Sequence, residues 1–160
     1  MATRKPSAAS AAAAPCGIDT TVVEQFIGYR TRRASLAIVS HFMEHMAAFD
    51  LRPVTFTLLT LIASNPGVLS SQLCALLGIQ SSNLVALVKR LRERGLVDRR
   101  PHPNDVRAFG LYLTPEGQRF FEEAQAAALA SGLQATAGLS DAERETLSRL
   151  LQKIYRPALP

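Results

Sequence analysis

The sequence predicts a mainly α-helical protein with one small β-hairpin, and three observations lead to this fold class. Apolar residues recur every three or four positions through most of the chain after residue 17, which is the spacing of one helix face. Gly78 and Gly95 each follow a short amphipathic stretch, at the place where a left-handed glycine ends a helix. Between residues 96 and 113 the period changes from helical to alternating, as it does in strands.

The composition is that of one domain with arms. The chain has 160 residues, of which 48% are hydrophobic and 19% are charged, so it can bury a core without disulfides or metals. Its two cysteines, Cys16 and Cys74, cannot form a disulfide framework. No stretch reaches the roughly 18 consecutive apolar residues that cross a bilayer. We therefore expect a cytoplasmic protein without a transmembrane segment.

Residues 1–17 predict a disordered N-terminal arm, since they are rich in alanine and contain no Leu, Ile, Val or Phe. Arg4 and Lys5 ahead of the alanines resemble the start of a secretory signal. Alanine is a weak substitute for an apolar core, however, and Pro15 suits neither a cleavage site nor a lipid anchor at the next residue. We exclude this arm from the fold.

Residues 18–49 predict one long helix, because the segment contains no proline and a single glycine, Gly28. Two neighbouring apolar stripes give this helix a wider apolar surface than the flank of a small domain requires. We expect the helix to be buried between two bodies, which favours dimerisation. The first stripe comprises Val22, Phe26, Tyr29, Leu36, Val39, Phe42, Met43 and Met46, and the second comprises Val23, Ile27, Ala34 and Ile38.

Three further helices precede the change of period. Residues 54–64 predict a mostly buried helix, and residues 70–77 predict a short one that begins with an N-cap at one of its first two serines. The next helix covers residues 82–94, with its cap at Gln80 or Ser81. Two helices joined by a short turn that contains glycine are typical of a helix-turn-helix.

A hairpin follows the second of these helices. The strands are expected at residues 96–100 and 109–113, on either side of a polar, basic tip at 101–105. A helix, a turn, a helix and a two-stranded hairpin together predict a winged helix-turn-helix.

Cap signals place the last two helices. Thr114 and Pro115 offer a cap and a first-position proline for a helix that runs to about Ser131. The run that starts at Ser140 and reaches Glu143 is a capping box for a final helix through residue 155. We assign residues 51–114 to a DNA-binding domain and residues 18–50 and 115–160 to a helical dimerisation region.

Most of the net charge of +5 lies in one segment. Residues 80–107 hold seven basic and three acidic residues, on the predicted second helix and hairpin. A localised basic stretch is the surface expected to meet DNA phosphates, although a solvated basic face has the same composition. The seven basic residues are Lys89, Arg90, Arg92, Arg94, Arg99, Arg100 and Arg107.

The predicted helix at residues 82–94 has the two faces that a recognition helix needs. Projection at about 100° per residue places Leu84, Leu87, Val88 and Leu91 on the packing face. Ser82, Ala86, Lys89, Arg90 and Glu93 fall on the outward face. We expect Ser81, Ser82 and Asn83 to approach base edges, because Asn can pair bidentately with adenine, and Lys89 and Arg90 to hold phosphates. The alternative is an ordinary amphipathic helix whose polar face contacts only solvent.

Two motifs around the hairpin are specific. Residues 105–117 (DVRAFGLYLTPEG) contain Asp-x-Arg followed by Leu-Thr-x-x-Gly, and residues 91–99 (LRERGLVDR) precede them. In both motifs the chain resembles the MarR family of bacterial transcription regulators, and the resemblance covers residues 18–155. The resemblance implies a homodimer on a near-palindromic operator, with Arg107 inserted into the minor groove and positioned by Asp105. Arg99 belongs to the same DNA-binding set. The alternative for Asp105 and Arg107 is a surface pair that stabilises a turn.

The resemblance also implies a repressor that a small ligand releases from DNA, since many members bind an aromatic acid or its thioester where the DNA-binding domain meets the dimer helices. The residues expected to wall that site are Ile38, Phe42, His45, Phe56 and Phe120. Each of them can equally be plain core. His45 is the one polar candidate, able to hydrogen-bond an effector oxygen.

Two rival functions start from other residues. His41, Glu44 and His45 match the H-x-x-E-H pattern of some zinc peptidases, which leaves a zinc hydrolase or a metal-responsive regulator as alternatives. A thiol-responsive regulator would use Cys16 or Cys74. We expect no enzyme, no cofactor and no resident metal, because a third ligand and a cleft are not evident in the sequence.

Overall fold

The computed structural model describes residues 17–102 and 105–155, apart from the side chains of residues 102–107. The predicted arm therefore lies outside the described residues, except for Gly17. The chain divides into two compact units, residues 1–36 and 37–160, and each is considered by itself.

The helix predicted over residues 18–49 is shorter than expected. A 3-10 turn, η1 (Val23–Gln25), comes first, and α1 (Ile27–His45) begins only after Phe26, whose backbone is extended with φ −88° and ψ 122°. After α1 a second 3-10 turn, η2 (Ala47–Phe49), ends at Asp50 in the left-handed region with φ 49°. The apolar spacing continues across both interruptions, so the period alone could not locate them.

The second unit confirms a mainly helical fold with a small antiparallel sheet. After η2 come α2 (Pro53–Ser64), β1 (Val68–Leu69), α3 (Ser70–Leu77), α4 (Ser81–Glu93), β2 (Val97–His102), β3 (Asp105–Leu113), α5 (Pro115–Ala135) and α6 (Asp141–Tyr155). The predicted serine cap of α3 is wrong, because Leu69 is the N-cap residue and its N–H donates to Gln72 Oε1 at 2.9 Å. Helix α5 also continues beyond Ser131 to Ala135.

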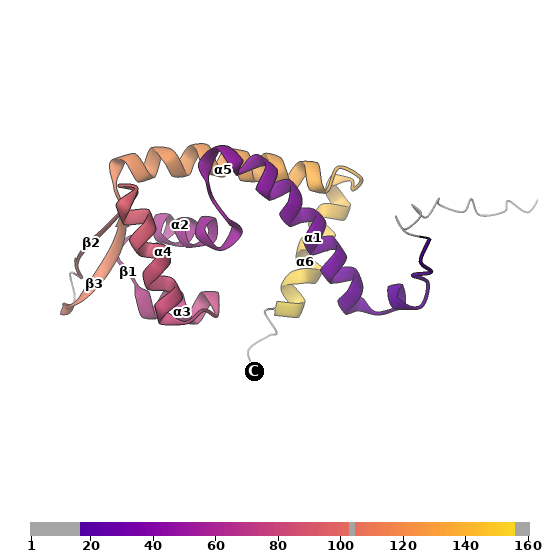
Figure 1. Cartoon of the computed structure of the whole chain (residues 1–160), viewed down its shortest axis with the longest axis horizontal. Helices are drawn as coiled ribbons and strands as arrows, with labels where there is room; N and C mark the ends of the chain where they lie inside the picture. The colour runs from indigo at the N-terminus through magenta and orange to yellow at the C-terminus, as the bar shows by residue number, and fades with distance from the viewer. Residues whose placement is uncertain (1–16, 103–104, 156–160) are drawn as a thin grey trace, which may run out of the picture. The chain divides into compact units, whose positions relative to one another are not determined.

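The sheet has three strands in the order β1-β3-β2, so β3 is central (Figure 1). Both wing strands reach further toward the tip than the predicted turn at 101–105 allowed. Pro101 pairs with Phe109 within β2, where it is tolerated because β2 is an edge strand and a bulge follows. The short strand β1 was not predicted, and it pairs Val68 with Leu111.

The core of the second unit lies between α2, α3, α4, the sheet and α5. Leu58, Leu59 and Ile62 of α2 are buried against residues of the helix-turn-helix and the strands. The remaining buried apolar residues are Met46, Leu51, Leu73, Leu84, Val88, Leu91, Leu96, Val97, Leu111, Phe121 and Ala124. One continuous core therefore holds the helix-turn-helix, the hairpin and the start of α5 together.

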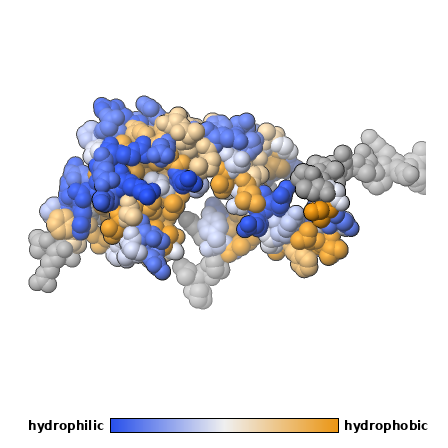
Figure 2. All heavy atoms as spheres, viewed as in Figure 1, coloured by the Kyte–Doolittle hydropathy of each residue, from blue (hydrophilic) through white to orange (hydrophobic). Residues whose placement is uncertain are grey.

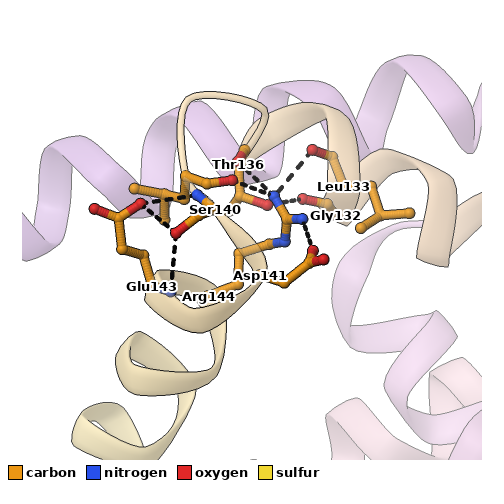
Figure 3. A network of polar contacts seen from close by, with 8 residues as sticks. Gly132, Leu133, Thr136, Ser140, Asp141, Glu143 and Arg144 are labelled. Carbon is orange, nitrogen blue, oxygen red and sulfur yellow. Dashed lines mark hydrogen bonds and ion pairs between the residues drawn. The ribbon is translucent and has the colours of Figure 1, made fainter.

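N-terminal caps mark the starts of α5 and α6, as predicted. Thr114 Oγ1 accepts the N–H of Gly117 at 2.9 Å, and the Ser140 N–H donates to Glu143 Oε2 at 2.8 Å. Arg144 then joins the two helices, since it donates to the Thr136 carbonyl at 3.2 Å and pairs with Asp141 (Figure 3). The bond from Arg144 thus gives a partner to the Thr136 carbonyl, at the C-cap of α5.

Among the described helices, no single one is both long and apolar enough to cross a membrane. Helices α3 and α4 are long and apolar enough only when they are taken together, and the pair is bent by 115°.

Candidate nucleic-acid interface

The helix-turn-helix positions α4 by a tight turn after α3. Gly78 ends α3 in the left-handed region with φ 63°, and its N–H donates to the Cys74 carbonyl. The axes of α3 and α4 are bent by 115°, which lies within the range of helix-turn-helix motifs. Gln80 is the N-cap residue of α4 and makes no side-chain capping bond.

Helix α4 has the two faces that its sequence predicted. Leu84 and Leu91 are 1% exposed and Val88 is 9% exposed, so this face is committed to the core. The opposite side of the helix is exposed at Ser81, Ser82, Asn83, Ala86, Lys89 and Arg90. Lys89 lies 3.7 Å from Glu93, an exposed ion pair that a phosphate can displace at little cost.

The wing strand β2 carries two arginines that stack on aromatic rings of β3. The Arg99 guanidinium lies 4.6 Å from the centroid of the Phe109 ring, and that of Arg100 lies 5.3 Å from the Tyr112 ring. Arg100 Nε also donates to Asp98 at 2.9 Å. That bond, with the Arg99 N–H, holds the pKa of Asp98 below its ordinary value. Asp98 is therefore an anion near neutral pH and reduces the local positive charge.

A hollow of about 380 Å³ lies between α4 and the sheet. Val88 and Leu111 are buried apolar residues that line it, and Lys89 and Arg99 bring charge from two elements. Ser70, Val85 and Arg92 complete the lining. Figure 2 shows hydrophilic residues gathered over the region of α4 and β2, on the left of the view.

The structure thus joins part of the predicted DNA-binding set in one body. Ser81, Ser82, Asn83, Lys89 and Arg90 share the exposed side of α4, and Lys89 and Arg99 line the same hollow. Asp105 and Arg107 stand in β3, but their side chains lie outside the described part of the chain.

The sequence places Arg92 and Arg94 in the basic segment but predicts no separate role for either of them. Arg92 lies one turn beyond Val88 on the hollow side of α4, which the helical projection of α4 could have shown. Arg94, at the end of α4, instead contacts the protein itself, because Nη2 donates to the Phe49 carbonyl at 2.9 Å. No local signal indicates that contact, because its partner is 45 residues away.

The expected effector residues fall into two aromatic clusters. The rings of Phe42 and Phe56 meet edge to face at 5.5 Å, and both residues are half-buried. Phe120 pairs with Phe49 at 5.6 Å and with the Arg94 guanidinium at 4.9 Å. The structure therefore brings Phe42 and Phe56 together and places Phe120 in a second cluster.

The two remaining effector candidates differ in exposure. Ile38 is 42% exposed, whereas His45 is half-buried. His45 Nδ1 lies 2.9 Å from the carbonyl of His41, one turn earlier in α1. That contact leaves only Nε2 of His45 for a ligand.

The residues behind the rival functions are placed as follows. His41 Nδ1 is 3.8 Å from Glu44 and has no hydrogen-bond partner among the described residues. In that part of the chain no three His, Cys, Asp or Glu residues gather closely enough to hold a metal ion. The half-buried Cys74 thiol donates to Ser81 Oγ at 3.8 Å, and Cys16 lies outside the described residues.

Comparison with known proteins adds a family and several relatives. A family model described as MarR family matches residues 49–108. A putative transcriptional regulatory protein for the hcr operon of Thauera aromatica is 33% identical over 131 residues, which are 81% of this chain and 79% of that protein.

Solved structures match the fold over most of the chain. The transcriptional repressor CouR bound to a 23-mer DNA duplex has a TM-score of 0.81 at 29% identity, with 87% of this chain and 99% of that chain covered. CouR from Rhodococcus jostii RHA1 bound to p-coumaroyl-CoA has a TM-score of 0.78 at 27% identity, with 88% and 99% covered.

Proposed function

This chain belongs to the MarR family of transcriptional regulators, and we propose that it is a homodimeric repressor that reads a two-fold symmetric DNA site. The observation that carries this proposal is the exposed, basic side of α4 beside the two-arginine strand β2, held on one core. A solved relative with this fold, CouR, is a repressor bound to a DNA duplex. The chain acts in the cytoplasm and performs no catalytic step.

In this proposal α4 enters the major groove and the hairpin lies against the neighbouring backbone. Ser81, Ser82 and Asn83 approach base edges, whereas Lys89, Arg90 and Arg99 bind phosphates. Arg107 enters the minor groove, where a narrow groove concentrates negative potential, and Asp105 orients its guanidinium. Two copies of α4 would then lie about 34 Å apart.

The dimerisation region comprises residues 18–50 and 115–160. Its helices leave large apolar side chains exposed in the single chain, as expected of surfaces that a second copy covers. Examples are Ile27 at 74%, Leu133 at 59% and Ile154 at 70% exposed.

We further propose that a small aromatic acid or its acyl thioester releases the protein from DNA. CouR in a complex with p-coumaroyl-CoA shows that a related repressor binds such a thioester. In this chain the half-buried rings of Phe42 and Phe56, with Ile38, His45 and Phe120, are the residues proposed to receive it.

The test is selection of a preferred duplex from random DNA, followed by gel shifts against a scrambled duplex at fixed salt. Tighter binding to the selected duplex, with inverted half-sites and two chains per duplex by sedimentation, supports the proposal. Equal affinity for both duplexes would contradict it. Addition of p-coumaroyl-CoA and of free aromatic acids to the selected complex then tests release.

A further inference from the structure

One apolar side chain of α4 has no place in the core. Val85 is 63% exposed, whereas Leu84, Val88 and Leu91 of the same helix are between 1% and 9% exposed and Leu87 is half-buried against the core. Valine is also a weaker helix former than alanine or leucine, so helix propensity does not account for it. The exposed surface of Val85 is therefore available to whatever α4 meets.

The neighbours of Val85 are suited to close contact with DNA. Ser82 and Lys89 lie three residues before it and four residues after it, so they share its side of the helix. Ala86, beside it, has no side chain beyond Cβ and leaves room for a base edge. Val85, Lys89, Arg92 and Arg99 line the same hollow, so cations from α4 and β2 flank the valine.

The basic residues around Val85 indicate which part of DNA would contact it. Phosphates held by Lys89, Arg92 and Arg99 bring the floor of the major groove against the first turns of α4. The base edges in that groove present hydrogen-bond donors and acceptors, and the one methyl group among them is the C5-methyl of thymine. An exposed branched apolar side chain buries the most apolar surface there against such a methyl group.

We propose that Val85 is a specificity-determining residue that contacts the C5-methyl group of a thymine in each half of the DNA site. This inference rests on the proposed function and deepens it, since it names one base feature that the helix reads. The contact selects thymine over uracil, which differs from thymine by that methyl group alone.

The experiment uses the full chain and a duplex selected from random DNA, in which each thymine pair related by symmetry is replaced by deoxyuridine. At one pair the affinity is expected to fall about fourfold for each methyl group, and hence about fifteenfold for the two half-sites, from the hydrophobic free energy of one carbon. For Val85→Ala, the affinities for the thymine and uracil duplexes should agree to within about twofold. Val85→Thr keeps one methyl group and should retain part of it.

Two variants serve as controls. Leu76→Ala removes an apolar side chain of α3 that is 69% exposed, and it should keep the full preference for thymine. Lys89→Ala should weaken binding to the thymine and uracil duplexes equally, because a phosphate contact does not sense the methyl group.

The outcomes separate this inference from the proposed function. If no sequence is preferred during selection, the proposed function falls, and this inference falls with it. If the selected duplex is preferred but uracil is tolerated at every position, or if Val85→Ala keeps the thymine preference, the inference alone is overturned.

Discussion

The Arg94 guanidinium donates a 2.9 Å hydrogen bond to the backbone carbonyl of Phe49, and both residues meet the Phe120 ring. Arg94 is the C-cap residue of α4, whereas Phe49 closes the turn between α1 and α2. The end of the proposed recognition helix is thus fastened to that turn and, through Phe120, to α5. A displacement of α1 or α5 by an effector would reach α4 through this contact.

Arg94→Ala should lower the free energy of unfolding by about 1 kcal/mol, since the hydrogen bonds to the Phe49 and Asp50 carbonyls and the contact with the Phe120 ring are lost at an exposed site. Urea denaturation measures this. Arg90→Ala is the matched control on the same helix, because the Arg90 side chain has no ion pair or ring contact within the described residues, and its effect should stay within about 0.5 kcal/mol. Equal effects would mean that the Arg94 contact contributes nothing.

Gly117→Ala should destabilise the protein by about 2 to 4 kcal/mol, because a Cβ there would lie 1.9 Å from the Leu96 carbonyl oxygen and the backbones must separate. Gly132→Ala is the control in the same helix, with no atom within 4 Å of the added Cβ. That variant should match the wild type or gain up to about 1 kcal/mol. Thermal unfolding of both variants decides whether the close approach of α5 to Leu96 is required.

Asn83→Ala should relax the base preference and cost about 1 to 3 kcal/mol on the selected duplex, with little loss on scrambled DNA. A bidentate contact to adenine requires the amide that alanine lacks. Gel shifts at fixed salt on both duplexes measure the ratio. An equal loss on both would remove Asn83 from the proposed base readers.

Arg107→Ala should weaken binding to the selected duplex strongly, and most where the flanking minor groove is narrow. Duplexes with and without an A-tract at that flank provide the comparison. Arg107→Lys keeps the charge, so any loss it shares with alanine reports the shape of the guanidinium. Unchanged binding by Arg107→Ala would contradict insertion into the groove.

Acid should weaken the cap of α6. The hydrogen bonds from Ser140 lower the pKa of Glu143, so this carboxylate is held more firmly in the folded than in the unfolded chain. A lowered folded-state pKa gives stability that is complete above the ordinary glutamate pKa and is lost as the pH falls through the lowered value.

The melting temperature of wild type should therefore exceed that of Glu143→Ala near neutral pH, and the gap should close as the pH falls below the ordinary glutamate pKa and through the lowered one. Glu145→Ala, which removes an exposed carboxylate of the same helix, controls for net charge. A gap that stayed constant with pH would exclude the charged form of Glu143 as the source.

The caps and faces of the helices could be predicted because their signals are local. Thr114 and Gly117, or Ser140 and Glu143, lie three residues apart, and the buried face of α4 follows from its own period. The same reasoning overlooked β1, since two residues show no alternation and its partner Leu111 is 43 positions from Val68. It also predicted that the first helix continues through Phe26, because apolar spacing gives no sign that the backbone becomes extended there.

In the candidate site, too, the features with local signals could be predicted and those that arise from tertiary packing could not. The exposed residues of α4 were predicted from the helical period, whereas the hollow that joins Lys89 to Arg99 arises from packing of α4 on the sheet. The separation of Phe120 from Phe42 and Phe56 likewise depends on how α5 packs, because Phe121, the next residue, takes the place beside Phe56 at 6.3 Å. Period alone does not choose between adjacent phenylalanines.

The short strand β1 has a consequence for how the protein meets DNA. It precedes α3 directly and pairs with the central strand β3, so the loop before the helix-turn-helix and the hairpin move as one piece. Gly110 and Gly67 approach so closely that a Cβ on Gly110 would lie 2.7 Å from the Gly67 Cα atom. The base of the wing therefore stands at a fixed offset from α4. A DNA site whose groove spacing departs from that offset must bend or twist to fit, and the energy of that deformation becomes part of what the protein recognises.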